Sequence, residues 1–342
     1  MSVETVRALI SMASTLLVDA GLPKRRAQQT AAILVQADVW EIPSHGLLRL
    51  PIYLDRLKAG GSRADAELGQ RDDTGPFIVY DGGGGLGHWQ LQEVASECAN
   101  RAGEYGLAAA GLGNSGHCGA LGVYAAQVAA QGKLGLLFSS GPPAIPPWGG
   151  HKPVLSTSPI AAGIPFNNEY AIVDLSLSTA ARGRIVAHRN AGTKLPDGWA
   201  FDSQGNATTD PTEALNGMLA PLGGAKGYAL AFMVEALTAG LFGPMLSIEM
   251  PDFFDSGAYE QPQYVSHFVL ALDPDRLAYN QHSRGYWDRL SELCSQVENA
   301  GGRVPGRAKR LLEGHDDALL VEVDDVVHQD LTKRLAKIDG GG

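Results

Sequence analysis

The sequence of 342 residues is poor in cysteine, and its three cysteines lie far apart, at Cys98, Cys118 and Cys294. The chain has no CxxC pair, which excludes a zinc ribbon and a disulfide framework as the basis of the fold. Isolated cysteines of this kind are typical of proteins that work in a reducing compartment. We therefore predict a cytoplasmic protein.

Basic residues are also in deficit, since 27 Lys and Arg stand against 37 Asp and Glu and the net charge is −10. Such a chain is repelled by the phosphates of nucleic acid and by an anionic membrane surface. The sequence has no uninterrupted run of 18 apolar residues, and its first residues lack the basic and apolar parts of a secretory signal. We expect no nucleic-acid partner and no membrane span.

What the chain does contain suits a globular enzyme. Apolar residues make up 44% and charged residues 19% of the sequence, and 43 glycines predict many tight turns. Helical patterns at 3–20, 23–40 and 44–58 predict an N-terminal helical unit, with a break in the third helix near Pro51. The acidic tail from residue 313 is weakly patterned and is expected to be peripheral.

Beyond residue 76, strand-like runs alternate with helical patterns, which predicts a mixed α/β (α+β) fold. The expected strands are 77–80, 107–112, 134–138, 154–164, 170–175 and 265–272, and the expected helices are 89–104, 119–131, 227–241 and 284–300. A Gly- and Pro-rich stretch at 141–150 is predicted to be a loop.

A first candidate site is the segment Ser44-His45-Gly46-Leu47-Leu48-Arg49. If Ser44 caps a helix, His45 and Arg49 lie four residues apart on one face of it. An imidazole exchanges protons near pH 7, and a guanidinium binds a carboxylate through two parallel hydrogen bonds. This pair suits a dehydrogenase of 2-oxo or 2-hydroxy acids. A capped helix whose polar side chains face water would have the same spacing.

The glycine run Gly82–Gly87 matches the dinucleotide fingerprint G-x-G-x-x-G, follows an expected strand and precedes an expected helix. A Rossmann site also needs an acidic residue about 20 positions on, at the end of the second strand. That strand ends in Gly111-Leu112-Gly113-Asn114, without an acid. We therefore predict that these glycines do not bind a dinucleotide.

The turn Asn114–Ala120 joins an expected strand to an expected helix. The amides of Gly119, Ala120 and Leu121 lack partners within that helix and could bind a phosphate, with His117 at the mouth of the turn. The alternative is a glycine-rich turn that only reverses the chain and leaves His117 solvated.

Two further residues have both a functional and a structural interpretation. Asp174, at the end of an apolar strand, could bind a ribose hydroxyl or could cap the next turn. Lys226 lies among glycines that leave room for a phosphate, but it could equally be an exposed loop lysine. Metal-ligand spacing is absent from the sequence, so no metal is predicted. A Ser-His hydrolase is disfavoured because the chain has no G-x-S-x-G elbow and adjacent side chains such as Ser44 and His45 diverge on a helix.

With these segments identified, the chain resembles the type-2 malate/L-lactate dehydrogenase family across nearly its full length. The matching motifs are Ser44-His45-Gly46 with Arg49, Asn114–Ala120, Pro147-Trp148-Gly149-Gly150, Val173–Ser178, Leu195–Ala200, Thr208–Pro211, Gly223–Tyr228 and Val304-Pro305-Gly306.

The resemblance implies NAD(P)-linked hydride transfer in a fold that is not a Rossmann fold, in a protein that is a homodimer. It implies that His45 protonates the substrate carbonyl, that Ser44 orients His45 and that Arg49 holds the substrate carboxylate. His117 lines the same site and takes the acid/base role in some relatives, and Thr157 lies where relatives contact substrate. The cofactor contacts implied by the resemblance are Cys118, Gly119, Ala120, Leu121, Asp174, Leu175, Ser176, Lys226, Pro305 and Gly306.

Three departures from the family pattern affect specificity. Trp40-Glu41 replaces the usual Arg-Gly, and Ser158 replaces the usual Asn before Pro159. Arg307 stands where an acidic residue is common, with Lys309 nearby. A cation at that position favours a 2′-phosphate, so we predict NADP(H) over NAD(H).

From these observations we predict an N-terminal helical unit (1–75) packed with 284–342, a substrate-side α/β segment (76–122) and an NAD(P)-binding domain (123–283). The predicted activity interconverts a small anionic 2-oxo acid and its 2-hydroxy acid, of the malate, sulfolactate or lactate type. The alternative within the family is reduction of cyclic imino acids such as piperideine-2-carboxylate. A non-catalytic small-molecule-binding protein is the alternative from another class.

Overall fold

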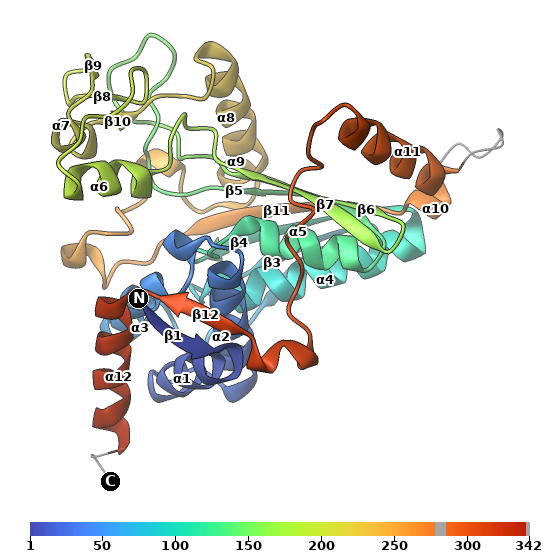
Figure 1. Ribbon diagram of the computed structural model, residues 1–342, viewed down its shortest axis with the longest axis horizontal. Helices are drawn as coiled ribbons and strands as arrows, with labels where there is room; N and C mark the ends of the chain where they lie inside the picture. Colours follow the sequence, from blue (N-terminus) through green and yellow to red (C-terminus); the bar gives the residue numbers. More distant parts are fainter. Residues whose placement is uncertain (278–284, 340–342) are drawn as a thin grey trace.

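The computed structural model describes residues 1–277 and 285–339 and is organised around one mixed seven-stranded sheet (Figure 1). The strand order is β2-β3-β4-β11-β5-β6-β7, and only the pair β3–β4 is parallel. The strands are β2 (Gly69–Asp73), β3 (Phe77–Asp81), β4 (Leu107–Ser115), β5 (Leu134–Ser139), β6 (Ile160–Phe166), β7 (Glu169–Leu175) and β11 (Val265–Leu272).

Helices cover both faces of this sheet. Helices α4 (Gly87–Tyr105) and α5 (Leu121–Ala130) pack against each other and against the strands, and α9 (Ala239–Phe242) contacts β4 and β11. Because β4 is covered on both faces, its residues are small. A side chain in place of Gly111 or Gly113 would overlap Phe242 of α9.

The N-terminal unit contains α1 (Val6–Asp19), α2 (Lys24–Val39) and α3 (Leu50–Ala59). The expectation that the tail from 313 is peripheral is wrong. Strand β12 (Leu320–Val323) pairs with β1 (Ser2–Thr5), and the following helix α12 packs on α1. The tail is weakly patterned because only one side of each element is buried, through Val321, Val323, Val327 and Leu331.

The other C-terminal segments lie elsewhere. Helix α11 (Tyr286–Asn299) contacts β6 and buries Cys294 against Phe166 and Val304, whereas α12 (Asp325–Asp339) lies against α1. The division of the chain at 75, 122 and 283 stays a prediction. The remaining short elements are α10 (Pro274–Leu277), η3 (Ser247–Glu249), η4 (Ser256–Ala258) and η5 (Gly314–Ala318).

A small lobe sits over one end of the sheet and contains α6 (Arg182–Asn190), α7 (Pro211–Leu215) and α8 (Ala225–Leu237) (Figure 1). It also holds a three-stranded sheet, β10-β8-β9, formed by Met218–Leu219, Ala200–Phe201 and Ala207–Thr208.

One predicted strand near this lobe begins later than expected. Residues 154–159 are irregular, because Leu155 forms only an isolated bridge with Ile145, and Ser158 has φ +46°. Pro159, which cannot donate a ladder hydrogen bond, then precedes β6.

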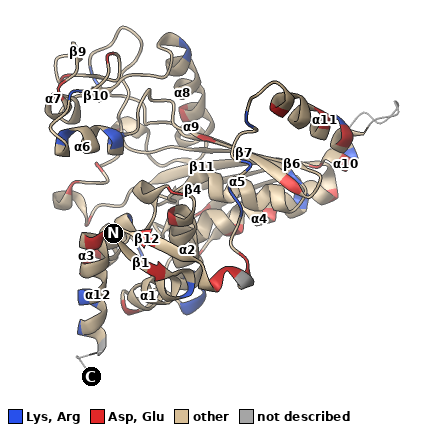
Figure 2. Ribbon diagram, viewed as in Figure 1, with Lys and Arg blue, Asp and Glu red and all other residues tan. Residues whose placement is uncertain are grey.

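Positions of Lys, Arg, Asp and Glu are spread over the helices and loops with both signs interspersed, while the central strands of the sheet are almost entirely tan (Figure 2). Helix α8, in contrast, consists mostly of apolar residues. Together with α9, the segment Ala225–Phe242 is long and apolar enough to cross a membrane by length and composition alone, and a third of it is buried. Its exposed apolar residues include Leu230, Phe232, Met233 and Leu241.

Candidate active site

The segment Ser44–Arg49 is not the single helix that its sequence suggested. It forms two short 3-10 turns, η1 (Pro43–His45) and η2 (Leu47–Arg49), which precede α3. Gly46 separates them with φ −95° and ψ −147°, an extended conformation that no helix contains. The break predicted near Pro51 is confirmed, because Pro51 lies in the first turn of α3 and the helix starts only at Leu50.

Asp38, near the end of α2, holds this pair of turns in place. Its carboxylate accepts a hydrogen bond of 2.8 Å from the amide of Leu47. A side chain at Gly46 would overlap the same carboxylate, so glycine is required there by the close approach. Burial raises the pKa of Asp38 to about 7. A buried carboxyl group thus supports the turn that carries His45 and Arg49.

Ser44 and His45 do not diverge, contrary to the sequence-based expectation. The Ser44 hydroxyl lies 2.9 Å from His45 Nδ1, and the Ser44 carbonyl accepts a 2.8 Å hydrogen bond from Arg49 Nε. Burial, and then the charge of Arg49, lower the pKa of His45 to about 4.

His117 lies beside His45, although the two are separated by 72 positions in the sequence. Their rings are stacked with centroids 5.9 Å apart. His117 Nδ1 lies 2.7 Å from the hydroxyl of Tyr53, on α3, and 3.2 Å from the amide of Gly119. Phe253 stacks on His117 at 4.9 Å. The structure therefore brings together both histidines that the sequence singled out.

Two more histidines lie behind this pair. His88 on α4 and His267 on β11 are fully buried, and burial lowers their pKa values to about 3 and about 4. His267 Nε2 contacts the carbonyl of Gly116 at 3.2 Å, while both ring nitrogens of His88 lack a partner within the described residues. Tyr53 meets the His88 ring edge-on at 4.6 Å. The site is thus backed by neutral imidazoles.

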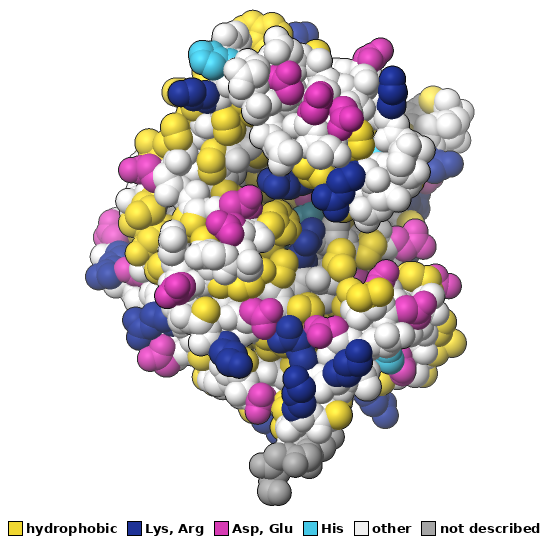
Figure 3. Space-filling view, turned by 90° about the vertical axis from the view of Figure 1, so that its left-hand side faces the viewer, with side chains coloured by type: hydrophobic (Ala, Val, Ile, Leu, Met, Phe, Trp, Pro, Cys, Tyr) yellow, Lys and Arg dark blue, Asp and Glu magenta, His cyan; other side chains and the backbone are white. Residues whose placement is uncertain are grey.

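Arg49 points its guanidinium at the ring of Phe254, 4.6 Å away, and no carboxylate among residues 1–277 and 285–339 pairs with it. Arg182, at the start of α6, lies 5.5 Å from the same ring and 3.7 Å from Asp252. Burial, the largest effect, and the nearby charge of Arg182 both lower the pKa of Arg49. Two cations therefore converge where α6 faces the N-terminal unit, and Figure 3 shows a hollow on this side, bordered by Lys and Arg side chains.

The residues expected to contact the cofactor at the start of α5 are almost all engaged within the protein. Cys118, Ala120 and Leu121 are buried in the sheet core. The amide of Gly119 bonds to His117, and the amide of Gly122 bonds to the Asp174 carboxylate at 2.9 Å. Burial raises the pKa of Asp174. Asp174 thus caps α5, not the turn that follows its own strand as one of the two expectations had it, and its negative charge opposes a phosphate at this helix end.

A second group of expected residues gathers at the edge between the sheet and the small lobe. The carbonyl of Thr157 accepts from the amide of Leu177 at 2.8 Å, which places Thr157 next to the segment that carries Leu175 and Ser176. Lys226 is exposed in the first turn of α8. The adjacent Gly224 lies against the ring of Trp148. Side chains here can reach solvent and a bound ligand.

The loop at Pro305–Arg307 runs along the edge strand β7. The carbonyl of Pro305 accepts from the amide of Ile172 at 2.9 Å, and a side chain at Gly306, with φ +59°, would crowd Ile172. The cation expected from Arg307 is already neutralised, because its guanidinium pairs with Glu169 at 2.8 Å and with Glu298. Lys309 has no ion pair within the described residues and lies 5.3 Å from the Trp40 ring.

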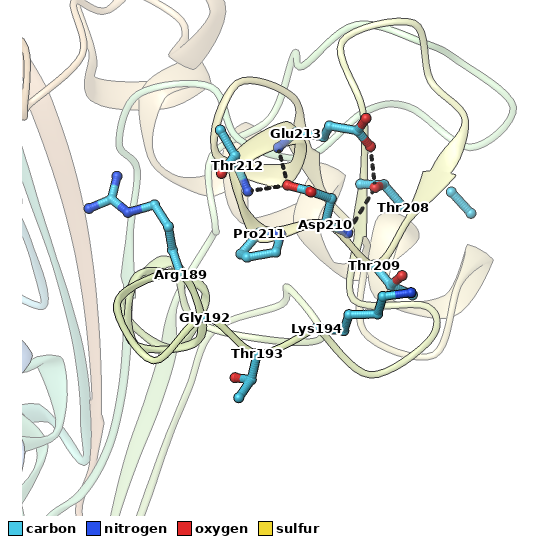
Figure 4. A pocket seen from close by; sticks show the side chains of 11 residues that line it. Arg189, Gly192, Thr193, Lys194, Thr208, Thr209, Asp210, Pro211, Thr212 and Glu213 are labelled. Atoms are coloured by element: carbon cyan, nitrogen blue, oxygen red, sulfur yellow. Dashed lines mark hydrogen bonds between the residues drawn. The ribbon is translucent and has the colours of Figure 1, made fainter.

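A separate pocket of about 570 Å³ lies in the small lobe and is lined by residues 189–194 and 207–213 (Figure 4). Its carboxylates serve the local fold: Asp210 caps α7 through the amides of Thr212 and Glu213, and Glu213 accepts from the Thr208 hydroxyl. None of the predicted site residues line it. In the described part of the chain, no cluster of His, Cys, Asp and Glu could hold a metal ion.

The geometry described so far agrees with the comparison to known families. The model of the malate/L-lactate dehydrogenases matches residues 5–332. The chain belongs to the malate/L-lactate dehydrogenase family. It is an oxidoreductase that interconverts 2-oxo and 2-hydroxy acids or reduces imino acids in an NAD(P)-dependent reaction.

Relatives with two kinds of activity are similar to the chain. It is 36% identical over 310 residues to a (2R)-3-sulfolactate dehydrogenase (NADP(+)) of Chromohalobacter salexigens, covering 90% of this chain and 91% of the relative. It is 32% identical over 307 residues to a Δ1-pyrroline-2-carboxylate/Δ1-piperideine-2-carboxylate reductase of Pseudomonas aeruginosa, covering 89% and 90%.

Solved structures of the family have the same fold. Sulfolactate dehydrogenase of Methanocaldococcus jannaschii superposes with a TM-score of 0.88 at 25% identity, covering 99% of this chain and 98% of that one. The Δ1-piperideine-2-carboxylate reductase of Pseudomonas syringae gives a TM-score of 0.88 at 28% identity, covering 98% and 100%. The expected mixed α/β fold of this family is confirmed.

Three contributors to the site were not predicted from the sequence, namely Asp38, Tyr53 and Arg182. Asp38 and Tyr53 lie on helices, where the apolar periodicity predicts only which positions are buried. It does not predict which distant residues these two side chains contact. Arg182 and Arg184 follow shortly after the motif Val173–Ser178. This pair of cations was the one sequence signal that could have indicated Arg182 as part of the site.

Proposed function

We propose that the hollow around His45, Arg49 and His117 binds a small 2-oxo acid for reduction to the 2-hydroxy acid. The observation that carries this proposal is the Arg49 guanidinium, which is desolvated, lacks a carboxylate partner within the described residues and lies next to two stacked histidines. A bidentate hydrogen bond from Arg49 would hold the substrate carboxylate. The substrate carbonyl would then lie near the imidazoles.

His45 supplies the proton in this proposal. A nicotinamide cofactor supplies the hydride when bound, and the carbonyl oxygen then takes a proton from the imidazolium form of His45. Without a bound substrate the imidazolium form of His45 is disfavoured, because burial and the charge of Arg49 both lower the pKa of His45. A bound carboxylate would neutralise Arg49 and raise this pKa, which ties protonation of His45 to substrate binding.

We further propose a substrate with a second anionic group, as in malate or sulfolactate. Arg182 supports this, because its guanidinium shares the Phe254 ring with Arg49 and its ion pair with Asp252 is long, at 3.7 Å. A second carboxylate or sulfonate could replace Asp252 as its partner. Reduction of cyclic imino acids is the second candidate, supported by the similarity to pyrroline- and piperideine-2-carboxylate reductases.

The test measures nicotinamide absorbance at 340 nm with a panel of substrates. Oxaloacetate and sulfopyruvate represent 2-oxo acids with a second anionic group, pyruvate lacks that group, and piperideine-2-carboxylate represents the imines. We expect the first two to have the highest kcat/KM. A preference for the imine would favour the second candidate, and no turnover of any compound would favour a non-catalytic binding protein.

For the cofactor we propose NADP(H) over NAD(H). The similarity to an NADP(+)-dependent sulfolactate dehydrogenase supports this proposal. Arg307 is neutralised by Glu169 and Glu298, so we now assign the cation for a 2′-phosphate to Lys309, which has no ion pair within the described residues. We expect NADPH to have at least a tenfold higher kcat/KM than NADH, and a tenfold preference for NADH would refute the proposal.

We also propose that the protein is a cytoplasmic homodimer. Cytoplasmic location is supported by three cysteines that are all unpaired and buried. Dimerisation is supported by the apolar surface of α8 and α9, on which Phe232 is 60% and Leu241 is 63% exposed. A second copy of the same helix pair, packed against it, would remove these side chains from water.

A further inference from the structure

His117 is held between two hydrogen-bond donors at a single ring nitrogen. The amide of Gly119 lies 3.2 Å from Nδ1 and the hydroxyl of Tyr53 lies 2.7 Å from it. A backbone amide can only donate, so Nδ1 must accept, and the proton of the neutral ring is then on Nε2. The Tyr53 hydroxyl then donates to Nδ1 as well. The two donors share the single lone pair of Nδ1, and the contact from Tyr53 is the shorter one, so Tyr53 contributes most to keeping the proton on Nε2. The tautomer of His117 is therefore fixed by its surroundings.

The groups that face His117 give no support to a second proton. The turns η1 and η2 contribute His45 and Arg49, α4 contributes His88 and β11 contributes His267, and all four lower the pKa of His117. On α3 the neighbour is Tyr53, and in the segment before β11 the neighbours are Phe253 and Gln263, all uncharged. Within the described residues, no carboxylate acts on this ring. Burial, the largest effect, together with the neighbouring histidines and Arg49 lowers the pKa of His117 well below its usual value.

Protonation of His117 would also break the fold locally. A proton on Nδ1 would displace the hydrogen bond from the Gly119 amide and reverse the role of Tyr53, whose hydroxyl is buried. A buried amide without a partner is costly. Gly119 cannot move away easily, because it has φ +75° and is packed between His88 and the carbonyl of His45.

His45 is not restricted to one tautomer or to the neutral form. Its Nδ1 faces the hydroxyl of Ser44 at 2.9 Å, and a hydroxyl can donate to a neutral ring or accept from a protonated one by rotating. The two stacked imidazoles therefore differ in what they can do with a proton, although both are histidines in one pocket.

We propose that Tyr53 is a positioning residue that fixes His117 as the neutral Nε2–H tautomer, so that His117 acts as a permanent hydrogen-bond donor to the substrate oxygen and His45 alone transfers the proton. This inference rests on the proposed reduction of a 2-oxo acid for its functional part. The tautomer itself does not depend on which substrate is used.

The tautomer is measured directly in the full-length protein labelled with ¹⁵N-histidine. Long-range ¹H–¹⁵N spectra distinguish Nε2–H from Nδ1–H rings and imidazolium, and His117→Gln identifies the signal of His117 by its loss. We expect His117 to be Nε2–H and not to titrate between pH 5.5 and 8. A signal of the Nδ1–H form, or titration in that range, would overturn the proposal.

The role of Tyr53 is tested with Tyr53→Phe, and Tyr124→Phe is the matched control. Tyr124 is also fully buried, and its hydroxyl donates to the carbonyl of Cys118 instead of to a histidine. Tyr53→Phe should make His117 titratable or produce a mixture of its two tautomers. It should also lower kcat about fivefold to tenfold, which corresponds to the loss of one hydrogen bond, with little change in KM. Tyr124→Phe should leave the His117 signal unchanged.

The outcomes separate this inference from the proposed function. If no 2-oxo acid is reduced but His117 has the expected spectrum, the proposed function fails and the fixed tautomer stands. If the wild type is active and the spectrum of His117 is the same with and without the Tyr53 hydroxyl, the inference about Tyr53 fails. Should Tyr53→Phe not fold, the wild-type spectrum alone decides whether His117 is a neutral donor.

Discussion

At the scale of single residues, the site depends on close approaches that leave no room for a side chain. Gly46 is the clearest case, because the Asp38 carboxylate occupies the place where its side chain would be. We predict that Gly46→Ala displaces the Asp38–Leu47 hydrogen bond and lowers kcat/KM by roughly 100-fold, since small misplacements of catalytic groups have effects of that order. Steady-state kinetics would measure the loss.

A double-mutant cycle provides the control for this prediction. In the background Asp38→Ala, the carboxylate is absent, so adding Gly46→Ala should cost much less than it does in the wild type. Independent, additive effects of the two substitutions would show that the steric explanation is wrong. Thermal unfolding of all variants separates a local change in the turn from a global loss of stability.

Arg49 is the second residue whose chemistry can be tested alone. Arg49→Lys keeps the charge but replaces a planar fork with a single ammonium, which cannot form two parallel hydrogen bonds. We expect KM for the 2-oxo acid to rise at least about tenfold with a smaller change in kcat. An unchanged KM would mean that Arg49 does not bind the carboxylate.

His45 is proposed to supply the proton, so His45→Ala should lower kcat by roughly 10²–10⁴-fold in the same steady-state assay.

The sequence singled out residues that the structure brings together, but it did not predict their geometry. Ser44, His45 and Arg49 stand in one motif, but their 3-10 turns result from Asp38 and Gly46, which contact each other across eight positions. Tyr53 reaches His117 across 64 positions, and Arg307 meets Glu169 across 138. Such pairings follow from the packing of elements and have no local signal.

At the scale of elements, the apolar periodicity predicted most helices and strands, and it failed where other forces decide. Residues 154–159 are apolar enough for a strand, but Ser158 and Pro159 interrupt the ladder. The stretch 320–331 is weakly patterned because acidic residues interrupt its apolar ones and only one side of each element is buried, yet pairing with β1 and packing on α1 order it. Local backbone geometry at Ser158 and Pro159 decided the first case, and a partner distant in sequence decided the second.

Helix α8 gives a prediction at this scale. Substitution Phe232→Glu places a charge in the centre of the exposed apolar surface, and we expect it to shift the protein from dimer to monomer in size-exclusion chromatography with light scattering. Leu107→Glu is the matched control, because Leu107 is also an exposed apolar residue but lies at the start of β4, outside that surface. A wild-type monomer, or a Phe232→Glu dimer, would refute the assignment of α8 to the interface.

At the scale of the whole molecule, the buried histidines couple stability to pH. The pKa values of His45, His88 and His267 are lowered to about 4, 3 and 4, whereas an unfolded chain protonates them near 6.5. Between pH 4 and 6.5 the unfolded state therefore binds more protons, and stability falls as the pH falls. Asp38, with its pKa raised to about 7, and Asp174, whose pKa is also raised, act in the opposite direction but are fewer than the buried histidines.

We accordingly expect the Tm to be lower at pH 5 than at pH 7, measured by calorimetry at constant ionic strength. His88→Gln removes one of the buried imidazoles and should reduce the difference in Tm between the two pH values. His151→Gln changes an exposed histidine and should leave that difference as it is in the wild type. Equal pH dependence in all three proteins would contradict this account.

The pairing of β1 with β12 has a consequence for how the chain reaches this fold during synthesis. Residues 2–5 lie against residues 320–323, so the core that they close with Leu9, Val323 and Leu331 joins the first and last parts of the described chain. Closing such a loop is slow compared with forming local contacts. On the ribosome, α1 and α2 must wait until residue 331 has emerged before their apolar faces are fully covered. The N-terminal helices are therefore completed only after β12 and α12 have been synthesised, and until then their apolar faces are exposed to chaperones.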